Sequence, residues 1–229
     1  MANEIISYLE MCRREGASLQ RGMNFGLGHG HSVILMSLRR NAPYHDRVVD
    51  DGTTLIYEGH DQPHSTIIPQ PKAVDQPEFT PGGVLTENGK FHRAAQAVKS
   101  GQRSPERVRV YEKLHQGIWS YNGVFHLVDS WQESDGTREV FKFKLAAVEG
   151  DEDFGQPASG HIQRRRLIPT AVKLVVWQRD GGKCVICGAA DELHFDHVLP
   201  YSKGGTSIKA ENVQLLCARH NLEKSDKIV

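Results

Sequence analysis

The apolar residues between positions 32 and 148 recur in short runs, and clusters of Gly, Asp, Asn and Pro separate one run from the next. Apolar and polar residues often alternate within a run, and β-branched and aromatic residues are frequent. These features are typical of strands that bury one face. The runs are SVILMS (32–37), TLIYEG (54–59), RVRVYEKL (107–114), GIWSYNGVFHLVDSW (117–131) and EVFKFKLAAV (139–148). We therefore expect a mostly β domain, either a sandwich or a barrel.

Two segments near these runs have a helical pattern instead. Residues Ile5 to Arg14 have the composition and spacing of a short helix that ends at Gly16. The segment NGKFHRAAQAVKSG (88–101) places four apolar residues on one face of a helix and ends at a glycine. These four residues are Phe91, Ala94, Ala95 and Val98. The N-terminal domain should therefore contain few helices.

The segment 151–166 has no periodicity and contains Gly, Pro, Ser and three consecutive arginines. This composition is typical of a linker. It would separate an N-terminal domain, residues 1–150, from a C-terminal domain, residues 167–229.

The C-terminal domain has its own order of elements. LIPTAVKLVVWQRDGG (167–182) predicts a helix that opens at Pro169 and stops at a glycine pair. LHFDHVLP (193–200) alternates like a strand, and the turn YSKGGTS would fold it back. VQLLCARHNLEKS (213–225) then predicts a second helix. The chain as a whole is expected to be α+β.

The formal charge of the chain is zero, with 28 Lys and Arg against 28 Asp and Glu. Taken alone, this balance argues against a nucleic-acid partner, because phosphate binding usually requires excess basic charge. The balance hides an asymmetry. Residues 161–229 carry 11 basic and 7 acidic side chains, a net charge of +4, which leaves −4 on residues 1–160. The C-terminal domain is therefore the better candidate for contact with phosphates.

No apolar stretch approaches the roughly 18 residues that a membrane span requires, and no secretory leader is recognisable. We expect a soluble protein located in the cytoplasm. A reducing compartment also favours metal binding over disulfides for clustered cysteines.

Three of the four cysteines lie between positions 184 and 217. Cys184 and Cys187 are spaced as a zinc knuckle, and Cys217 and His220 form a second pair with the same spacing. Four ligands close a tetrahedral site, so we expect a structural Zn²⁺ in a domain whose small core is marginal by itself. The alternative is a set of free buried cysteines with a surface histidine, which two paired spacings disfavour.

The region between the two pairs resembles the HNH endonuclease family, whose metal finger is a strand, a strand and a helix (ββα-metal fold). The resemblance extends over about residues 172–226. The residues that carry it are Asp196, His197, Pro200, Gly204, Gly205, Asn212, Leu216, Cys217, Asn221 and Lys224. His220 occupies a position where many members have a fourth cysteine, and zinc accepts either residue.

These residue types permit phosphodiester hydrolysis with one divalent cation. His197 is suited to act as a general base near neutral pH. Asp196 and Asn221 offer oxygen ligands for a catalytic Mg²⁺ or Mn²⁺. The resemblance implies that Asn212 braces the loop and orients the base, and Lys224 could contact the phosphate. The alternatives are an ordinary strand end at the Asp-His pair and a surface amide on the helix.

The N-terminal domain resembles the SRA (SET and RING-associated) domain, a β-rich fold that flips 5-methylcytosine out of a DNA duplex. The resemblance spans about residues 16–148. It is carried by SVILMSLRRNAPYHDRVVDDGTTLIYEGHD (32–61), LTENGKFHRAAQAV (85–98) and the segments RVRVYEKL and YNGVFHLVDSWQE within 107–133.

A flipped cytosine needs rings to stack on and a carboxylate that accepts from its N4 amine. Tyr44, Tyr57 and Asp46 are the candidates for this pocket, with Asp50 or Asp51 as alternatives to Asp46. The two tyrosines could equally be half-buried strand residues, and Asp46 a turn residue. Candidates for phosphate contacts, with a solvated surface role as the alternative, are His29, His31, Arg39, Arg40 and Arg93.

The two resemblances together imply a modification-dependent restriction endonuclease that serves in host defence. Its partner would be double-stranded DNA containing 5-methylcytosine or 5-hydroxymethylcytosine. One HNH site cuts one strand, so a homodimer would help to produce double-strand breaks. The alternatives are a non-catalytic reader of modified DNA and an HNH nuclease without modification dependence.

Overall fold

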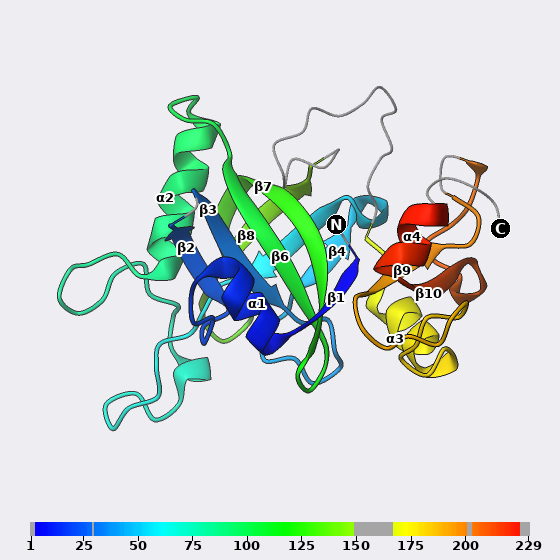
Figure 1. The fold of residues 1–229 in the computed structure, drawn as a ribbon. Helices are drawn as coiled ribbons and strands as arrows, with labels where there is room; N and C mark the ends of the chain where they lie inside the picture. Colours follow the sequence, from blue (N-terminus) through cyan, green and yellow to red (C-terminus); the bar gives the residue numbers. More distant parts are fainter. Residues whose placement is uncertain (1–2, 29, 149–166, 201–202, 225–229) are drawn as a thin grey trace.

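The structure is a computed structural model that describes residues 3–28, 30–148, 167–200 and 203–224 (Figure 1). The predicted linker, 151–166, lies outside the described residues. The α+β class is confirmed. The helices are α1 (Tyr8–Glu15), α2 (Glu87–Lys99), α3 (Thr170–Arg179) and α4 (Ala218–Lys224). The strands are β1 (Glu4–Ser7), β2 (Met23–Leu27), β3 (His31–Met36), β4 (Arg47–Val49), β5 (Thr54–Glu58), β6 (Glu106–His115), β7 (Ile118–Ser134), β8 (Glu139–Ala147), β9 (Leu193–His197) and β10 (Val213–Cys217).

The long strand β7 organises the N-terminal domain. Its 17 residues pair antiparallel with β1 and β6 through the first part and with β8 through the second. The sheet continues from β6 to β3 in parallel and from β3 to β2 antiparallel, while β8 leads to β5 and β4. All five strand runs predicted from the sequence are present as β3, β5, β6, β7 and β8. The short strands β1, β2 and β4 were not predicted.

Helix α2 covers the core of this sheet, as the apolar pattern of its sequence predicted (Figure 1). Thr86 caps its N-terminus by accepting a hydrogen bond from the backbone of Gly89. Phe91 and Ala95 are fully buried and pack with residues of β3, β5, β7 and β8 in one apolar cluster. The helix therefore closes one face of the curved sheet.

The predicted N-terminal helix is wrong in its first residues. Ile5 lies in β1, and the helix begins at Tyr8 after Ser7, whose hydroxyl and backbone form a capping box with Glu10. The helix ends as predicted, with Gly16 in the left-handed conformation at φ 60°. Pairing with β7 across the whole of β1 outweighs the local helical preference.

The C-terminal domain contains α3, the β9–β10 hairpin and α4. The segment 213–217, predicted as the start of a helix, is the strand β10, and the helix begins only at Ala218. The five residues of β10 pair with the five of β9, and Val213, Leu215 and Leu216 are fully buried in one apolar cluster that also contains residues of α3. A short apolar run fits a strand or a helix equally well, and here the pairing partner decides.

Strand β1 joins the strands of the two predicted domains into one sheet, with the order β10-β9-β1-β7-β6-β3-β2. Glu4 pairs with His194 of β9, and the backbone N–H of Phe195 donates to the carbonyl of Asn3 at 3.0 Å. Ile5 and Leu114 also pack into the core of the C-terminal domain. Figure 1 shows β1 between the large sheet and the elements β9, β10 and α4.

Candidate functional site: a metal cluster, a nuclease strand and a cavity

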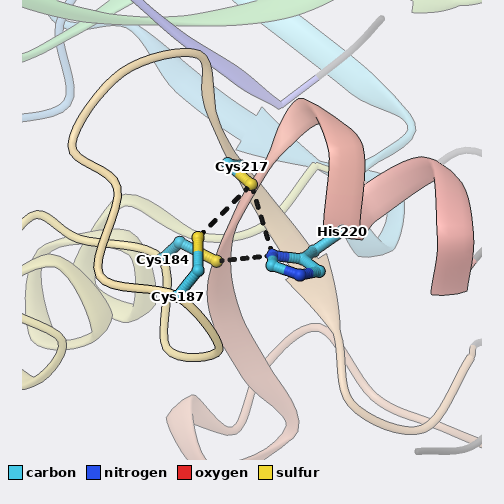
Figure 2. A group of neighbouring side chains, drawn as sticks. All are labelled: Cys184, Cys187, Cys217 and His220. Atoms are coloured by element: carbon cyan, nitrogen blue, oxygen red, sulfur yellow. Dashed lines mark hydrogen bonds between the residues drawn. The ribbon is translucent and has the colours of Figure 1, made fainter.

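The four predicted zinc ligands lie together (Figure 2). Cys184 and Cys187 come from the turn after α3, Cys217 ends β10, and His220 lies in the first turn of α4. The turn is held by the backbone N–H of Gly188, which donates to the carbonyl of Cys184 at 2.8 Å. Two segments distant in the sequence, 184–187 and 217–220, thus converge on one point.

The spacing of these ligand atoms fits a tetrahedral zinc. His220 Nδ1 lies 3.4 Å from both Cys184 Sγ and Cys217 Sγ, and Cys187 Sγ lies 3.9 Å from Cys217 Sγ. A zinc with Zn–S bonds of about 2.3 Å requires S···S edges of about 3.8 Å and S···N edges of about 3.5 Å. All four ligand atoms lie within 4.8 Å of one another.

The electrostatic environment of Cys184 favours the thiolate that metal binding requires. Burial opposes ionisation, but hydrogen bonds from the backbones of Cys217, Cys187 and Ile186 outweigh it and lower the pKa of Cys184 to about 6. A thiolate is the form of cysteine that binds metal.

His197 ends strand β9 and is held by a hydroxyl that sequence analysis missed. Its Nε2 lies 2.9 Å from Ser207 Oγ, and Ser207 is 6% exposed. Burial lowers the pKa of the His197 imidazole below its ordinary value. The ring is thereby kept neutral near pH 7, as a general base requires. Ser207 lies in the turn before Asn212, where its sequence signal does not differ from that of any turn serine.

Lys224 is buried within this site. It is 3% exposed, and its Nζ lies 2.9 Å from Asp196 Oδ2 and donates to the carbonyl of His197 at 2.6 Å. The ammonium therefore compensates the charge of Asp196 and ties α4 to the end of β9. This is a positioning role, and the phosphate contact expected of Lys224 stays a prediction.

Asn212 braces the loop between β9 and β10. Its Oδ1 accepts from the backbone of Leu199 at 2.8 Å, and its Nδ2 donates to the carbonyls of Leu199 at 3.1 Å and Thr206 at 3.0 Å. The loop is tight at Gly205, where a Cβ atom would lie 1.8 Å from the carbonyl oxygen of Leu199. Only glycine fits there.

Asn221 is half-buried on α4, next to the zinc ligand His220. Within the described ranges, no hydrogen bond involves its side-chain amide. Asp196 is engaged by Lys224 and, at 3.5 Å, by Gln214 Nε2. Helix α4 packs against β9, so Asn221 and Asp196 belong to adjoining elements.

A cavity of about 750 Å³ opens in the N-terminal domain. It is lined by all three residues predicted for the base pocket, and by one arginine predicted to contact phosphate. Six of its lining residues are Arg39, Tyr44, Asp46, Tyr57, His60 and Trp119. Its volume lies in the range of ligand-binding pockets.

The aromatic rings of this cavity are arranged differently from the prediction that paired Tyr44 with Tyr57. Tyr44 stacks on His60, with ring centroids 5.2 Å apart and an interplanar angle of 14°. Tyr57 is 1% exposed, belongs to the core, and presents its hydroxyl, 3.0 Å from His60 Nε2. His60 was missed because a histidine directly after a strand has no distinctive pattern. The ring of Tyr44 also has Lys72 Nζ 4.2 Å from its centroid.

Asp46 is anchored by two backbone N–H groups. Ser37 donates to its Oδ2 and Glu58 to its Oδ1, both at 3.1 Å. Burial nevertheless raises the pKa of Asp46 to about 7, since it outweighs these hydrogen bonds. Of the two alternatives, Asp50 is exposed and does not line the cavity, and the side chain of Asp51 lies outside the described residues.

The residues predicted to contact phosphates have different environments. Arg39 and Arg40 are exposed, and Arg39 lies at the cavity. Arg93 is exposed but paired with Glu78 at 3.0 Å. The prediction for His31 is wrong: it is 7% exposed and lies 2.6 Å from the buried carboxylate of Glu15, so no phosphate can reach it. His29 lies outside the described residues.

Residues 184–227 match the HNH endonuclease family. This match covers the metal cluster and all the residues described above on β9, β10 and α4. No curated protein matches the chain. No helix among the described residues is both long enough and apolar enough to cross a membrane.

Three solved structures are similar to this chain over 70% to 98% of its length. The SUVH5 SRA domain in complex with hemimethylated CG DNA is 22% identical, with a TM-score of 0.44 over 70% of this chain and 93% of that chain. The SUVH5 SRA domain bound to fully hydroxymethylated CG DNA is 22% identical, with a TM-score of 0.45 and the same coverage. The Type IV phosphorothioation-dependent restriction endonuclease ScoMcrA is 16% identical, with a TM-score of 0.44 over 98% of this chain and 56% of that chain.

Proposed function

We propose that this protein is a restriction endonuclease that recognises double-stranded DNA containing 5-methylcytosine or 5-hydroxymethylcytosine and cuts it with an HNH site. The observation that carries the proposal is the match of residues 184–227 to the HNH endonuclease family, with Asp196, His197 and Asn221 on the adjoining elements β9 and α4. The recognition half rests on the cavity around Tyr44, Asp46 and His60 and on the sequence resemblance to SRA domains.

In the proposed reaction, His197 accepts a proton from the attacking water. Ser207 fixes the direction of its ring, and burial keeps the ring neutral and ready to accept. Asn212 holds the loop that follows β9, and Lys224 holds the carbonyl of His197. The base is therefore held at the C-terminal end of β9 by three separate side chains.

Asp196 and Asn221 would hold the catalytic cation, Mg²⁺ or Mn²⁺, through oxygen atoms. When bound, such a cation stabilises negative charge on the phosphate and on the departing 3′ oxygen. The amide of Asn221 has no competing hydrogen bond among the described residues, which suits a ligand. The ammonium group of Lys224 lies 2.9 Å from Asp196 Oδ2 and holds this carboxylate in position.

The Cys184, Cys187, Cys217 and His220 cluster would hold a structural Zn²⁺. Its four ligands leave no open coordination position for a substrate. Its role is to join the turn after α3 to β10 and α4, and so to keep Asn221 beside β9.

In the proposed recognition step, a modified cytosine leaves the duplex and enters the cavity. Tyr44 and the ring of His60 that stacks on it supply the aromatic wall of the cavity, and the carboxylate of Asp46 offers an acceptor for the N4 amine. Tyr57 contributes its hydroxyl to the wall rather than a ring face. Arg39, which lines the cavity, and its exposed neighbour Arg40 would contact the phosphates beside the flipped base.

One HNH site cuts one strand at a time, so cutting both strands near one modified base takes a dimer or two independent encounters. We propose that the active form on DNA is a homodimer. Host defence in the cytoplasm would be the biological use. Light scattering of the protein with a modified duplex tests the dimer: a mass of two chains per duplex is expected. Monomers that yield double-strand breaks at a rate linear in protein concentration would contradict it.

The proposed function is tested with one plasmid prepared with cytosine, 5-methylcytosine or 5-hydroxymethylcytosine. Cutting of only the modified forms, dependent on Mg²⁺ or Mn²⁺, is expected. Equal cutting of all three forms would retain the nuclease and remove the modification dependence. Binding of the modified forms without cutting would identify a reader of modified DNA instead.

A further inference from the structure

Four polar residues are buried where α3 of the nuclease domain meets β6 and β7 of the large sheet. We call them the seam cluster: Glu112 on β6, Asn122 on β7, and Thr170 and Lys173 on α3. Lys173 is 0% exposed, Glu112 2%, Asn122 1% and Thr170 8%. Nothing in the proposed reaction uses these residues.

The seam cluster is closely bonded. Lys173 Nζ donates to Glu112 Oε2 at 2.6 Å and to Asn122 Oδ1 at 2.7 Å, and Thr170 Oγ1 donates to Glu112 Oε1. Asn122 Nδ2 donates to Glu112 Oε2 at 3.1 Å, and Ser120 Oγ donates to Asn122 Oδ1 at 3.2 Å. Every bond between α3 and the large sheet in this cluster passes through Lys173 or Thr170.

A buried charge pair constrains geometry more than an apolar contact does. Two apolar surfaces can slide past each other at small cost, whereas a displaced buried lysine and glutamate would lose their hydrogen bonds without regaining water. A leucine at position 173 would pack between domains with no such requirement. The seam cluster therefore favours one docking position of α3.

The same cluster reaches the cavity. Asn122 Nδ2 lies 3.8 Å from the sulfur of Met36, and Met36 lines the cavity. Lys113, the neighbour of Glu112, also lines it. On the other side, α3 packs against β10, which pairs with the strand that ends at His197. A short chain of packed elements thus connects the recognition cavity to the nuclease strand.

We propose that Lys173 is a positioning residue that sets the distance along the DNA between the recognised base and the cut. This inference rests on the proposed function. The seam cluster, with the strand pairing of β1 and β9, holds the nuclease strand in one place relative to the cavity. The enzyme consequently cuts at a narrow range of positions, not wherever a tethered nuclease can reach.

The test uses a long duplex with one modified cytosine and the full chain carrying K173M and E112Q together. This double substitution removes both charges, keeps the side-chain volumes similar and leaves no single buried charge. Lys183→Met is the matched control, because Lys183 is exposed on the same domain and outside the cluster. The wild type and the control are expected to cut within the same few base pairs. The double variant should spread its cuts several-fold more widely while its total nicking rate changes less than about threefold.

Loss of zinc from the double variant would reveal that it does not fold. In that case a milder variant, Thr170→Val, serves as the test. It removes one hydrogen bond at nearly constant volume and should broaden the cuts to a smaller extent. Cut positions equally narrow in the folded variants and the wild type would overturn the proposal. Scattered cutting by the wild type would overturn it too.

Small-angle X-ray scattering of the free proteins supplies a readout that does not depend on cutting. The wild type should have one compact profile, and the double variant a larger radius of gyration and maximum dimension. Identical scattering profiles of the wild type and the double variant would overturn the proposal that the seam cluster fixes the position of α3, whatever the cutting pattern. A third outcome is a compact wild type, an expanded double variant and no modification-dependent cutting by the wild type. This outcome would overturn the proposed function but not the role of the seam cluster in fixing α3.

Discussion

The nuclease strand and the recognition cavity hold their functional groups by different means. Around His197, the supports come from a short segment: the metal cluster, the amide of Asn212 and the ammonium of Lys224 all lie within the C-terminal domain. Around Asp46, the supports are backbone groups of two strand ends within a ten-stranded sheet and its large core. Removal of the supports around His197 should therefore abolish cutting. The same removal should leave the recognition cavity intact.

Removal of the zinc ligands is expected to have the largest effect and to separate the two regions. Cys184→Ser with Cys217→Ser should abolish cutting by more than 100-fold, because structural zinc contributes on the order of 10 kcal/mol to the folding of small domains. Binding to modified DNA should remain, since the cavity has its own core. Cutting rates, zinc content and gel-shift affinity are the measurements.

Cys12→Ser is the matched control, as Cys12 lies on α1 far from the cluster in the sequence and should leave both properties unchanged. If loss of zinc removed DNA binding as strongly as cutting, the two regions would not be independent.

His197→Ala tests the nuclease strand without disturbing its fold. A general base contributes about 10²- to 10⁴-fold to a rate, so cutting should fall by that factor. The zinc content and the affinity for modified DNA should stay at the wild-type level. Ser207→Ala should cost less, about tenfold, because it removes only the hydrogen bond that orients the ring. Full cutting by His197→Ala would remove the assignment of the base.

Asp46→Asn tests the cavity through its pH dependence. In the proposed recognition step the ionised carboxylate accepts from the N4 amine, and burial raises the pKa of Asp46 to about 7. The affinity of the wild type for modified DNA should therefore increase as pH rises from 6 to 8. The substitution should flatten this profile and reduce the preference for modified DNA by about 5- to 100-fold, the value of one good base contact.

The pH dependence of the folding stability should have the opposite sign from the pH dependence of DNA affinity. The folded pKa lies above the unfolded value, so the folded state binds the proton more tightly, and the free energy of unfolding should decrease as pH rises from about 4 to 7. Asp50→Ala is the control for both profiles, because Asp50 is exposed and outside the cavity. A wild-type affinity that is flat across this pH range would contradict the acceptor role.

Arg93→Ala is expected to have the smallest effect. Its guanidinium already pairs with Glu78 and lies 5.1 Å from the ring centroid of Phe79. We expect less than a threefold loss of affinity, equal for modified and unmodified DNA, because a phosphate contact carries no base information. Arg40→Ala, which removes the exposed arginine that follows the cavity-lining Arg39 in the sequence, should cost more and lower the salt dependence of binding. A larger loss of affinity for Arg93→Ala than for Arg40→Ala would indicate that the DNA lies closer to α2.

The sequence predicted the metal cluster more completely than the recognition cavity, for a physical reason. The knuckle spacings at Cys184 and Cys217 report a site built from nearby residues, so the pattern alone locates the ligands. The cavity depends on contacts between distant strands, and the pattern identified Tyr44 and Asp46 but missed His60. His31 was misjudged because its partner, Glu15, lies on a different element and is buried with it.

The two errors in secondary structure have the same origin. Ile5 to Ser7 form a strand because β7, more than 110 residues away, pairs with them, and β9 pairs with the preceding Glu4. Residues 213–217 form a strand because β9 pairs with them. Local propensity is weak compared with such pairing, so only the assembled sheet decides.

The most direct test of the account is the rate of cutting of two short duplexes that differ only in one methyl group at cytosine C5. With Mg²⁺ or Mn²⁺ present, the wild type should cut the methylated duplex at least tenfold faster. Asp46→Asn should lose most of that ratio, whereas His197→Ala should lose cutting of both duplexes while binding the methylated one preferentially. Equal rates on the two duplexes for the wild type would contradict the division of the chain into a reader and a nuclease.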